Sequence, residues 1–182
     1  CKHYSVPGKK WGVANNASVA TTSPRRASTS YLLLGSGGYV TTPVLSLTNR
    51  AVIGAAFYFT LPGYVTLYSG STAQLTLSWN GLGAVSVIRG DGSGTVLSSM
   101  PDGTLPEGSW FYLEFDGTVD DAAGAAEVRL NGSTLADLTL TGADTKPSAV
   151  TGVDRIRIAS GGGSMRVTDV YVDPSSFKGD CI

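Results

Sequence analysis

Two carboxylates stand at alternate positions of a segment that is expected to be extended. Glu114 and Asp116 flank Phe115, and alternate residues of a strand point to the same face of a sheet. A retaining glycosidase needs two carboxyl groups about 5 Å apart, and glycosidases that build them on one strand carry an E-x-D-x-E or E-x-D-x-x-E run. Thr118 and Val119 occupy the two positions where the further Glu would stand. We therefore expect Glu114 and Asp116 to be solvent-side residues of a half-buried strand, and we expect no catalytic residues.

The other nucleophiles and metal ligands are few and lie near the chain ends. His3 is the only histidine, and Cys1 and Cys181 are the only cysteines, so a catalytic triad would depend on a terminal segment. Cys1, His3 and Cys181 offer three zinc ligands without an evident fourth. We expect instead a Cys1–Cys181 disulfide, because the first and last strands of a sandwich are often neighbours. Free thiols and links to neighbouring subunits are the alternatives.

Acidic loops and two sequons are further candidate sites. Asp120-Asp121 and the loop from Asp91 to Asp102 lack the ligand spacing of a calcium cage, and the turn-forming role of Asp explains them more simply. We expect no cofactor and no metal, with calcium as the alternative. Asn16-Ala17-Ser18 and Asn131-Gly132-Ser133 match the glycosylation pattern, and we attribute both matches to chance.

Composition limits the class of protein. The 182 residues favour one domain, and 24 glycines with only 15% charged residues are typical of many short strands joined by tight turns. A formal charge of -1 disfavours nucleic acid and anionic membrane surfaces as partners. Apolar stretches such as Ala51 to Leu61 are too short to span a bilayer, and no signal peptide is visible.

The pattern of apolar runs and turns predicts an all-β, antiparallel two-sheet sandwich of about twelve strands. Residues 1-30 lack alternation and are expected to form an irregular N-terminal arm before a domain at 31-182. The arm is expected either to lie along the sandwich, anchored by Trp11, or to contact a neighbouring subunit. The expected strands are Tyr31–Leu34, Tyr39–Leu45, Ala51–Thr60, Tyr64–Tyr68, Gln74–Trp79, Ala84–Arg89, Thr95–Ser98, Trp110–Thr118, Ala125–Leu130, Thr134–Leu140, Val153–Ala159 and Met165–Val172.

Two hairpin turns can be placed from the sequence. Asn-Gly supplies the two positive φ angles of a type I′ turn, so Asn80-Gly81 and Asn131-Gly132 are expected to connect paired strands. The glycine-rich segments Gly35–Gly38, Gly90–Gly94 and Gly161–Gly163 are expected to be turns, because none has the context of a phosphate-binding loop.

The second half of the chain resembles a known family. The segments Gly108–Phe115, Gly124–Gly132 and Leu138–Thr145, with the closing strand Val167–Val172 and the tail Phe177–Cys181, resemble a concanavalin A-like (laminin-G-like) jelly-roll domain of tailed-bacteriophage virion proteins. Thr168 replaces an acidic residue of that pattern, and Lys178 replaces an aliphatic one. The specific resemblance covers about residues 108 to 181, and a weaker likeness extends back to about residue 25.

This resemblance implies a non-catalytic structural protein of a virion, as a capsid or tail decoration or part of a fibre. Its partners would be other virion proteins and copies of itself, and its location the extracellular particle. The alternative is a lectin-like module that binds cell-surface glycans. Tyr31, Tyr64 and Tyr68 could stack on sugar rings, but core aromatics give the same pattern, so the ligand-binding residues stay unassigned.

Overall fold

Strands make up nearly all of the regular structure in the computed structural model, which describes residues 11–21, 25, 30–59, 62–150 and 152–179. All strand pairs there are antiparallel, which confirms the predicted all-β class. The elements are β1 (Val13–Ala20), β2 (Tyr31–Thr41), β3 (Arg50–Phe59), β4 (Gly63–Ser69), β5 (Thr72–Trp79), β6 (Val85–Arg89), β7 (Thr95–Met100), β8 (Phe111–Thr118), β9 (Gly124–Leu130), β10 (Ser133–Thr134), the 3-10 helix η1 (Ala136–Leu138), β11 (Leu140–Ala143), β12 (Arg155–Ser160) and β13 (Met165–Asp173).

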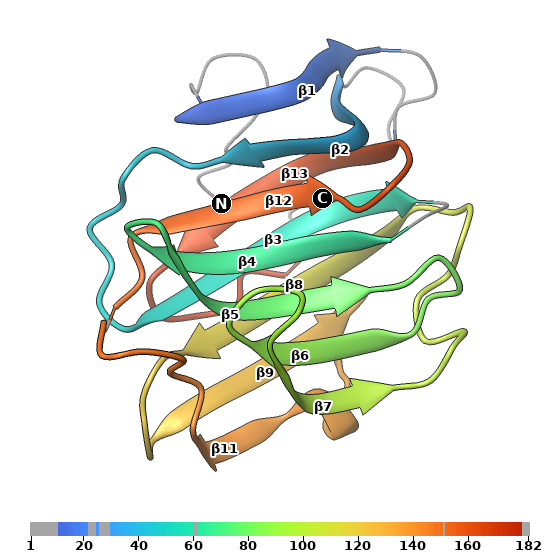
Figure 1. The fold of residues 1–182 in the computed structure, drawn as a ribbon. Coiled ribbons are helices and arrows are strands. Elements are labelled where there is room, and N and C mark those ends of the chain that lie inside the picture. The colour runs from blue at the N-terminus through green and yellow to red at the C-terminus, as the bar shows by residue number, and fades with distance from the viewer. Residues whose placement is uncertain (1–10, 22–24, 26–29, 60–61, 151, 180–182) are drawn as a thin grey trace.

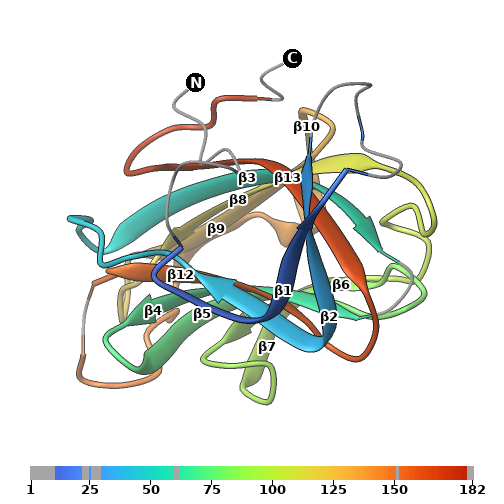
Figure 2. The ribbon, with the colours of Figure 1, turned by 90° about the horizontal axis from the view of Figure 1, so that it is seen from above.

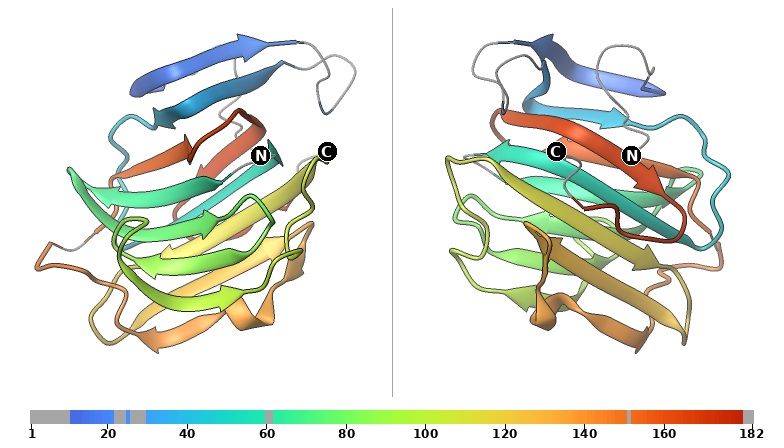
Figure 3. Two further views of the ribbon diagram at one scale, coloured as in Figure 1. Left: turned by 45° about the vertical axis from the view of Figure 1, so that its right-hand side comes forward. Right: turned by 180° about the vertical axis from the view of Figure 1, so that it is seen from behind.

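The strands form two layers that share strand β2. Their hydrogen-bonded order is β10-β9-β8-β3-β13-β2-β12-β4-β5-β6-β7, with β11 beside β9 and β1 beside β2. We name β13, β3, β8, β9, β10 and β11 the first layer, and β12, β4, β5, β6 and β7 the second layer; the two face each other (Figures 1 and 2). Residues 32–34 of β2 pair with β13, whereas residues 39–41 pair with β12. β1 pairs along both halves of β2, and this pair closes one side of the sandwich (Figure 3).

Glycines allow β2 to pass from one layer to the other. The expected strands Tyr31–Leu34 and Tyr39–Leu45 are one continuous strand that ends at Thr41, so the prediction of a turn at Gly35–Gly38 is wrong. Gly37 has a φ of 65°, and a Cβ on Gly38 would lie 2.5 Å from the Asn16 carbonyl oxygen. The chain bends here without leaving the sheet because these positions carry no side chain.

The core lies between the layers. Trp79 of β5 packs against Phe57 and Phe59 of β3, with ring centroids 5.2 and 5.9 Å apart. The alternating rows predicted to be buried on either side of the first turn are buried: Leu75, Leu77, Trp79, Val85 and Val87. This alternation gives each strand one face toward the core and one outward face, and the outward faces carry the polar side chains.

One of the two predicted turns is confirmed and the other is corrected. Asn131 and Gly132 have φ values of 50° and 84° between β9 and β10, as a type I′ turn requires. At Asn80-Gly81 the positive φ, 82°, falls on Gly83 instead. The Asn80 side-chain oxygen accepts hydrogen bonds from the N–H groups of Leu82 and Ala84 at 2.9 Å, so the side chain of Asn80 organises a longer loop.

Two other segments differ from expectation. Residues 13–20 of the expected irregular arm form strand β1, while Trp11 packs against the core as predicted. The predicted strand Thr134–Leu140 is instead β10, η1 and the start of β11, because buried Leu138 turns inward at the helical turn. The division at residues 30 and 31 stays a prediction. In the described part of the chain, no helix is long and apolar enough to cross a membrane.

Candidate functional site

The outward face of the second layer brings arginines and tyrosines together beside β2. On β12, Ile156 and Ile158 are in the core, so the alternate residues Arg155 and Arg157 point outward. The same alternation turns Tyr39 and Thr41 of β2 and Tyr68 of β4 to that face, because Val40 and Leu67 are buried. Arg157 pairs with Thr41 across one ladder, and Arg155 pairs with Tyr68 across the other.

Arg157 is held between two tyrosine rings. Its guanidinium carbon lies 4.4 Å from the ring centre of Tyr39 and 4.9 Å from that of Tyr68, close enough for cation–π attraction. Its Nε–H group donates to Thr41 Oγ1 at 3.3 Å, and Nη1 donates to the Tyr68 hydroxyl at 3.3 Å. These contacts fix the orientation of the guanidinium group before any ligand arrives.

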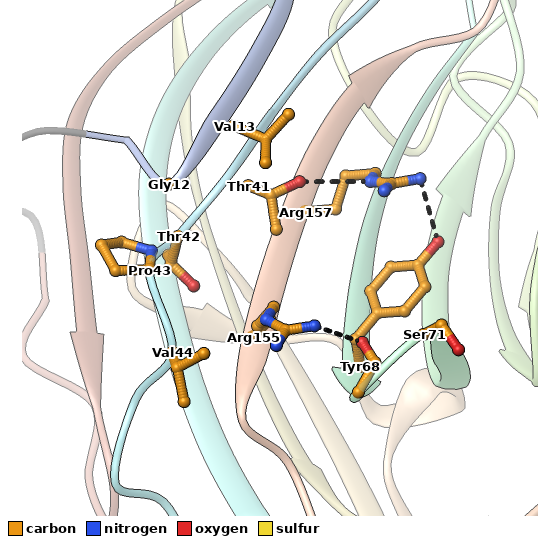
Figure 4. A pocket seen from close by; sticks show the side chains of 11 residues that line it. Gly12, Val13, Thr41, Thr42, Pro43, Val44, Tyr68, Ser71, Arg155 and Arg157 are labelled. Atoms are coloured by element: carbon orange, nitrogen blue, oxygen red, sulfur yellow. Dashed lines mark hydrogen bonds between the residues drawn. The ribbon is translucent and has the colours of Figure 1, made fainter.

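Arg157, Thr41 and Tyr68 border a pocket of about 520 Å³ between β2, β12 and β4 (Figure 4). Its volume falls in the usual range for small-molecule sites. Arg155 crosses the pocket floor and donates from Nη1 to the Gly70 carbonyl at 2.7 Å. The lining residues are Gly12, Val13, Thr41, Thr42, Pro43, Val44, Tyr68, Gly70, Ser71, Arg155 and Arg157.

The pocket is cationic. Its lining contains two arginines and no carboxylate, histidine or cysteine among the residues that the structure describes. The adjacent carboxylate, Asp154, accepts the Gly70 N–H bond at 3.1 Å on both oxygens and so shapes the turn after β4. The arrangement can therefore bind a polar ligand through N–H donors and a tyrosine hydroxyl.

Comparisons with known proteins identify the fold. No family model and no curated protein sequence matches the chain. Among solved structures, the chain is similar to Caenorhabditis elegans galectin LEC-6, with a TM-score of 0.53, 18% identity and coverage of 87% of this chain and 96% of the galectin. The fold is a concanavalin A-like jelly roll.

Two more solved structures share this jelly roll. The metal-free carbohydrate recognition domain of Emp46p has a TM-score of 0.53 and 12% identity, with 89% of each chain covered. A variant of the alginate lyase Aly36B in complex with an alginate tetrasaccharide has a TM-score of 0.57 and 12% identity, with 84% of this chain and 83% of the lyase covered. At these identities the likeness concerns the fold.

Glu114 is not the solvent-side residue that the sequence predicted. It is only 1% exposed on the outward face of the first layer of the jelly roll, and the segment after β13 runs along that face (Figure 3). Its Oε1 atom accepts hydrogen bonds from the Tyr171 hydroxyl and from the N–H groups of Lys178 and Gly179. Burial, followed by the hydrogen bond to Glu114, raises the pKa of Tyr171, so the phenol remains a donor.

Asp116 is also buried, at 7% exposed, which again contradicts the prediction. Both of its oxygens accept from the guanidinium group of Arg50, and this hydrogen bonding raises the pKa of Arg50. The two carboxylates thus serve separate structural contacts. Glu114 binds the C-terminal segment, residues 174–179, and Asp116 binds Arg50. They do not face a common cleft as a catalytic pair would.

Aspartates in the acidic loops act as turn formers. Asp120 Oδ1 accepts from the N–H groups of Ala122 and Ala123, and these bonds lower the pKa of Asp120. Asp91 accepts from the hydroxyl and N–H groups of Ser93, which lowers its pKa in the same way. Among the described residues, no cluster of three or more His, Cys, Asp or Glu could hold a metal ion. Cys1, His3 and Cys181 lie outside the described residues, so the disulfide stays a prediction.

The tyrosines named from the sequence have different positions. Tyr68 borders the pocket, and Tyr64 lies on the same face, where a Cβ on Gly92 would be 3.2 Å from its ring. Tyr31 is buried on the first layer against Trp110. Arg155 and Arg157 were not named from the sequence, although the alternation Arg-Ile-Arg-Ile at 155–158 predicts a strand with a cationic outward face. The partners from β2 and β4 could not be read from that pattern.

Proposed function

We propose that the chain is a non-catalytic, lectin-like module that binds glycans in the pocket between β2, β12 and β4. The observation that carries this proposal is the fixed, outward-facing arrangement of Arg157 between Tyr39 and Tyr68. Guanidinium N–H groups and a tyrosine hydroxyl are suited to sugar hydroxyls, while the ring faces suit the apolar C–H face of a sugar.

The comparisons support the carbohydrate part of this proposal. A galectin, a carbohydrate recognition domain and an alginate lyase in complex with an alginate tetrasaccharide share the jelly roll. The non-catalytic part is supported by the pocket lining, in which the described residues include no carboxylate or histidine that could act as a general acid or base.

Glycan-array screening of the purified chain tests the proposal. Reproducible binding with a Kd in the millimolar range or tighter is expected, and Tyr68→Ala is expected to abolish it. Tyr58→Ala is the matched control, because Tyr58 is a half-buried tyrosine whose ring is tilted against that of Trp110 on the first layer, away from the pocket. If the protein is folded by circular dichroism and binds none of the neutral and acidic glycans on the array, the proposal is contradicted.

A structural role in a tailed-phage particle is the second candidate. It is supported by the resemblance of residues 108 to 181 and by the edge strand β1, whose Val13 and Val19 side chains are 52% and 54% exposed. Exposed strand edges are surfaces through which subunits associate. Light scattering coupled to size exclusion tests this: a defined oligomer that Val19→Lys dissociates would favour it, and a monomer at 100 μM would oppose it.

A further inference from the structure

Most arginines of the described chain are neutralised, but two in one pocket are not. Four of the seven described arginines form ion pairs, Arg25 with Asp169, Arg50 with Asp116, Arg89 with Asp144 and Arg129 with Glu127. No described carboxylate forms an ion pair with the remaining three: Arg155, Arg157 and Arg166.

The unpaired arginines differ in their surroundings. Arg166 lies on the first layer over Tyr58 and Tyr31, at 4.7 and 5.4 Å from the ring centres, and borders none of the described pockets. Arg155 and Arg157 stand two residues apart on one face of β12 and both line the 520 Å³ pocket. Their charges therefore add in one hollow rather than disperse over the surface.

Both guanidinium groups have N–H donors left for a ligand. An arginine carries five N–H groups. Arg157 uses Nε and Nη1 on Thr41 and Tyr68, and Arg155 uses Nη1 on the Gly70 carbonyl. All three acceptors are neutral, and no described carboxylate forms an ion pair with either arginine; the adjacent Asp154 accepts from the Gly70 N–H group instead. Two like charges held together on a partly buried face favour an anion between them.

We propose that Arg155 and Arg157 form an anion subsite, so that the glycan bound in this pocket is an acidic saccharide. The inference rests on the proposed glycan-binding function and adds its ligand class. The anion is an oxyanion on a sugar ring, either a carboxylate or a sulfate ester, and the planar guanidinium groups would bind its oxygens through paired N–H bonds. A nucleic acid is a poor fit, because the formal charge of the chain is -1.

Paired ligands test this inference. The purified chain is titrated calorimetrically with oligogalacturonate and with the same oligosaccharide after carboxyl reduction, and likewise with sialyllactose and lactose. A sulfated galactan oligosaccharide and its desulfated form make up the sulfate arm. We expect at least one acidic member to bind ten-fold or more tightly than its neutral partner, with an affinity that falls as NaCl is raised from 50 to 500 mM. The arm that shows the difference identifies the anion.

Variants locate the subsite. Arg155→Gln and Arg157→Gln are each expected to weaken acidic binding ten-fold or more and neutral binding by a smaller factor, so that the preference for the acidic member is lost. Arg166→Gln is the matched control, because it also removes an unpaired arginine stacked on two tyrosines but on the other layer. Arg155→Lys retains the charge without the planar fork and should fall between the wild type and Arg155→Gln. Thermal unfolding of each variant checks that it folds.

The outcomes separate the inference from the function on which it rests. Equal binding of acidic and neutral partners by the wild type, lost in Tyr68→Ala, would overturn the anion subsite and leave the lectin-like function standing. Failure of every saccharide to bind would overturn both. As an independent readout, the Nε–H resonances of Arg155 and Arg157 should shift more in NMR spectra on addition of glucuronate than on addition of glucose, and equal shifts with both sugars would oppose the inference.

Discussion

Glu114 is a buried carboxylate that holds three donors on one oxygen atom, the hydroxyl of Tyr171 and two backbone N–H groups. Hydrogen bonds to a charged acceptor contribute about 1.5–3 kcal/mol each, and a buried donor without a partner is costly. We expect Glu114→Gln to lower the free energy of unfolding by about 2 kcal/mol, because the neutral amide accepts more weakly and adds buried N–H groups. Urea denaturation followed by circular dichroism measures this.

Glu107→Gln provides the control, because Glu107 is exposed and the same substitution there should change stability by less than about 0.5 kcal/mol. Equal effects of the two substitutions would show that Glu114 does not hold the C-terminal segment.

Gly54 lies where two tyrosines cover the outward face of β3. A Cβ there would be 2.2 Å from Tyr171 Cε1 and 2.9 Å from the Tyr112 hydroxyl oxygen. We expect Gly54→Ala to destabilise the protein by about 1–3 kcal/mol through overpacking. Gly162→Ala is the matched control, since a Cβ at Gly162 meets nothing within 4 Å and should be neutral within about 1 kcal/mol. The midpoint of thermal unfolding of each variant measures the change in stability. An unchanged midpoint for Gly54→Ala would contradict this packing.

At the scale of single residues, the sequence predicted on which face of the sheet a side chain lies better than it predicted whether that side chain is buried. Alternation placed Glu114 and Asp116 on the outward face, where they are, but it could not show that Arg50 and the segment after β13 cover them. Those partners are 64 to 66 positions away in the sequence. The tyrosine rings on either side of Arg157 could not be predicted for the same reason, because they belong to strands that are distant in the sequence and adjacent only in the fold.

The C-terminal segment, residues 174–179, is held on the outward face of the first layer by its own set of hydrogen bonds. Burial acts to raise the pKa of Asp173, but hydrogen bonds from Lys178 Nζ and from the N–H groups of Ser175 and Ser176 outweigh it and hold the pKa well below its ordinary value. A carboxylate whose pKa is lower in the folded state stabilises the fold above its unfolded pKa, about 3.9, and loses that contribution as pH falls through the lower folded value.

We therefore expect residues 174–179 to loosen as the pH is lowered from about 4 to 2, while the strands stay paired until more acid is added. NMR peak positions and heteronuclear relaxation of these residues follow the change. Asp173→Asn should loosen the segment already at pH 7 and reduce the pH dependence. A segment that stays as rigid in Asp173→Asn as in the wild type at pH 7 would contradict the proposed role of Asp173.

Turns show how far local sequence determines an element. Asn131-Gly132 forms the expected two-residue turn because β9 ends and β10 begins on either side of it. The same dipeptide at Asn80 forms a longer loop, in which the Asn80 amide nitrogen also donates to Asp102 at 2.9 Å. That competing contact comes from another loop, so the dipeptide alone could not distinguish the two cases. β2 was split in the prediction for a related reason: glycines in a bent strand resemble those of a turn.

For the molecule as a whole, the two layers are expected to unfold together. They share β2 and one core, in which Trp79 of the second layer packs on Phe57 and Phe59 of the first. Urea unfolding followed by far-ultraviolet circular dichroism, near-ultraviolet circular dichroism and tryptophan fluorescence should therefore give one coincident transition. Separate midpoints would indicate that the layers are independent units.

The fold class was predictable at this scale because it depends on features that recur along the whole chain, namely alternating apolar residues and regular turn signals. The proposed binding surface was not, because it depends on which outward faces meet and which remain open. The first layer carries more aromatic side chains on its outward face, including Trp110 and Phe177, yet its centre is covered. The second layer retains the pocket of about 520 Å³, whereas the pocket beside Arg50 and Asp116 on the first layer measures about 290 Å³.

The C-terminal segment and the pocket lie on opposite outward faces of the jelly roll. Gly179 is fixed to Glu114 on the first layer, whereas Arg155 and Arg157 open from the second. A tether that follows Gly179 therefore starts on the side away from the pocket. A biosensor surface loaded through such a tether would have its attachment point on the face opposite the proposed binding face, so that immobilisation would leave the pockets uncovered.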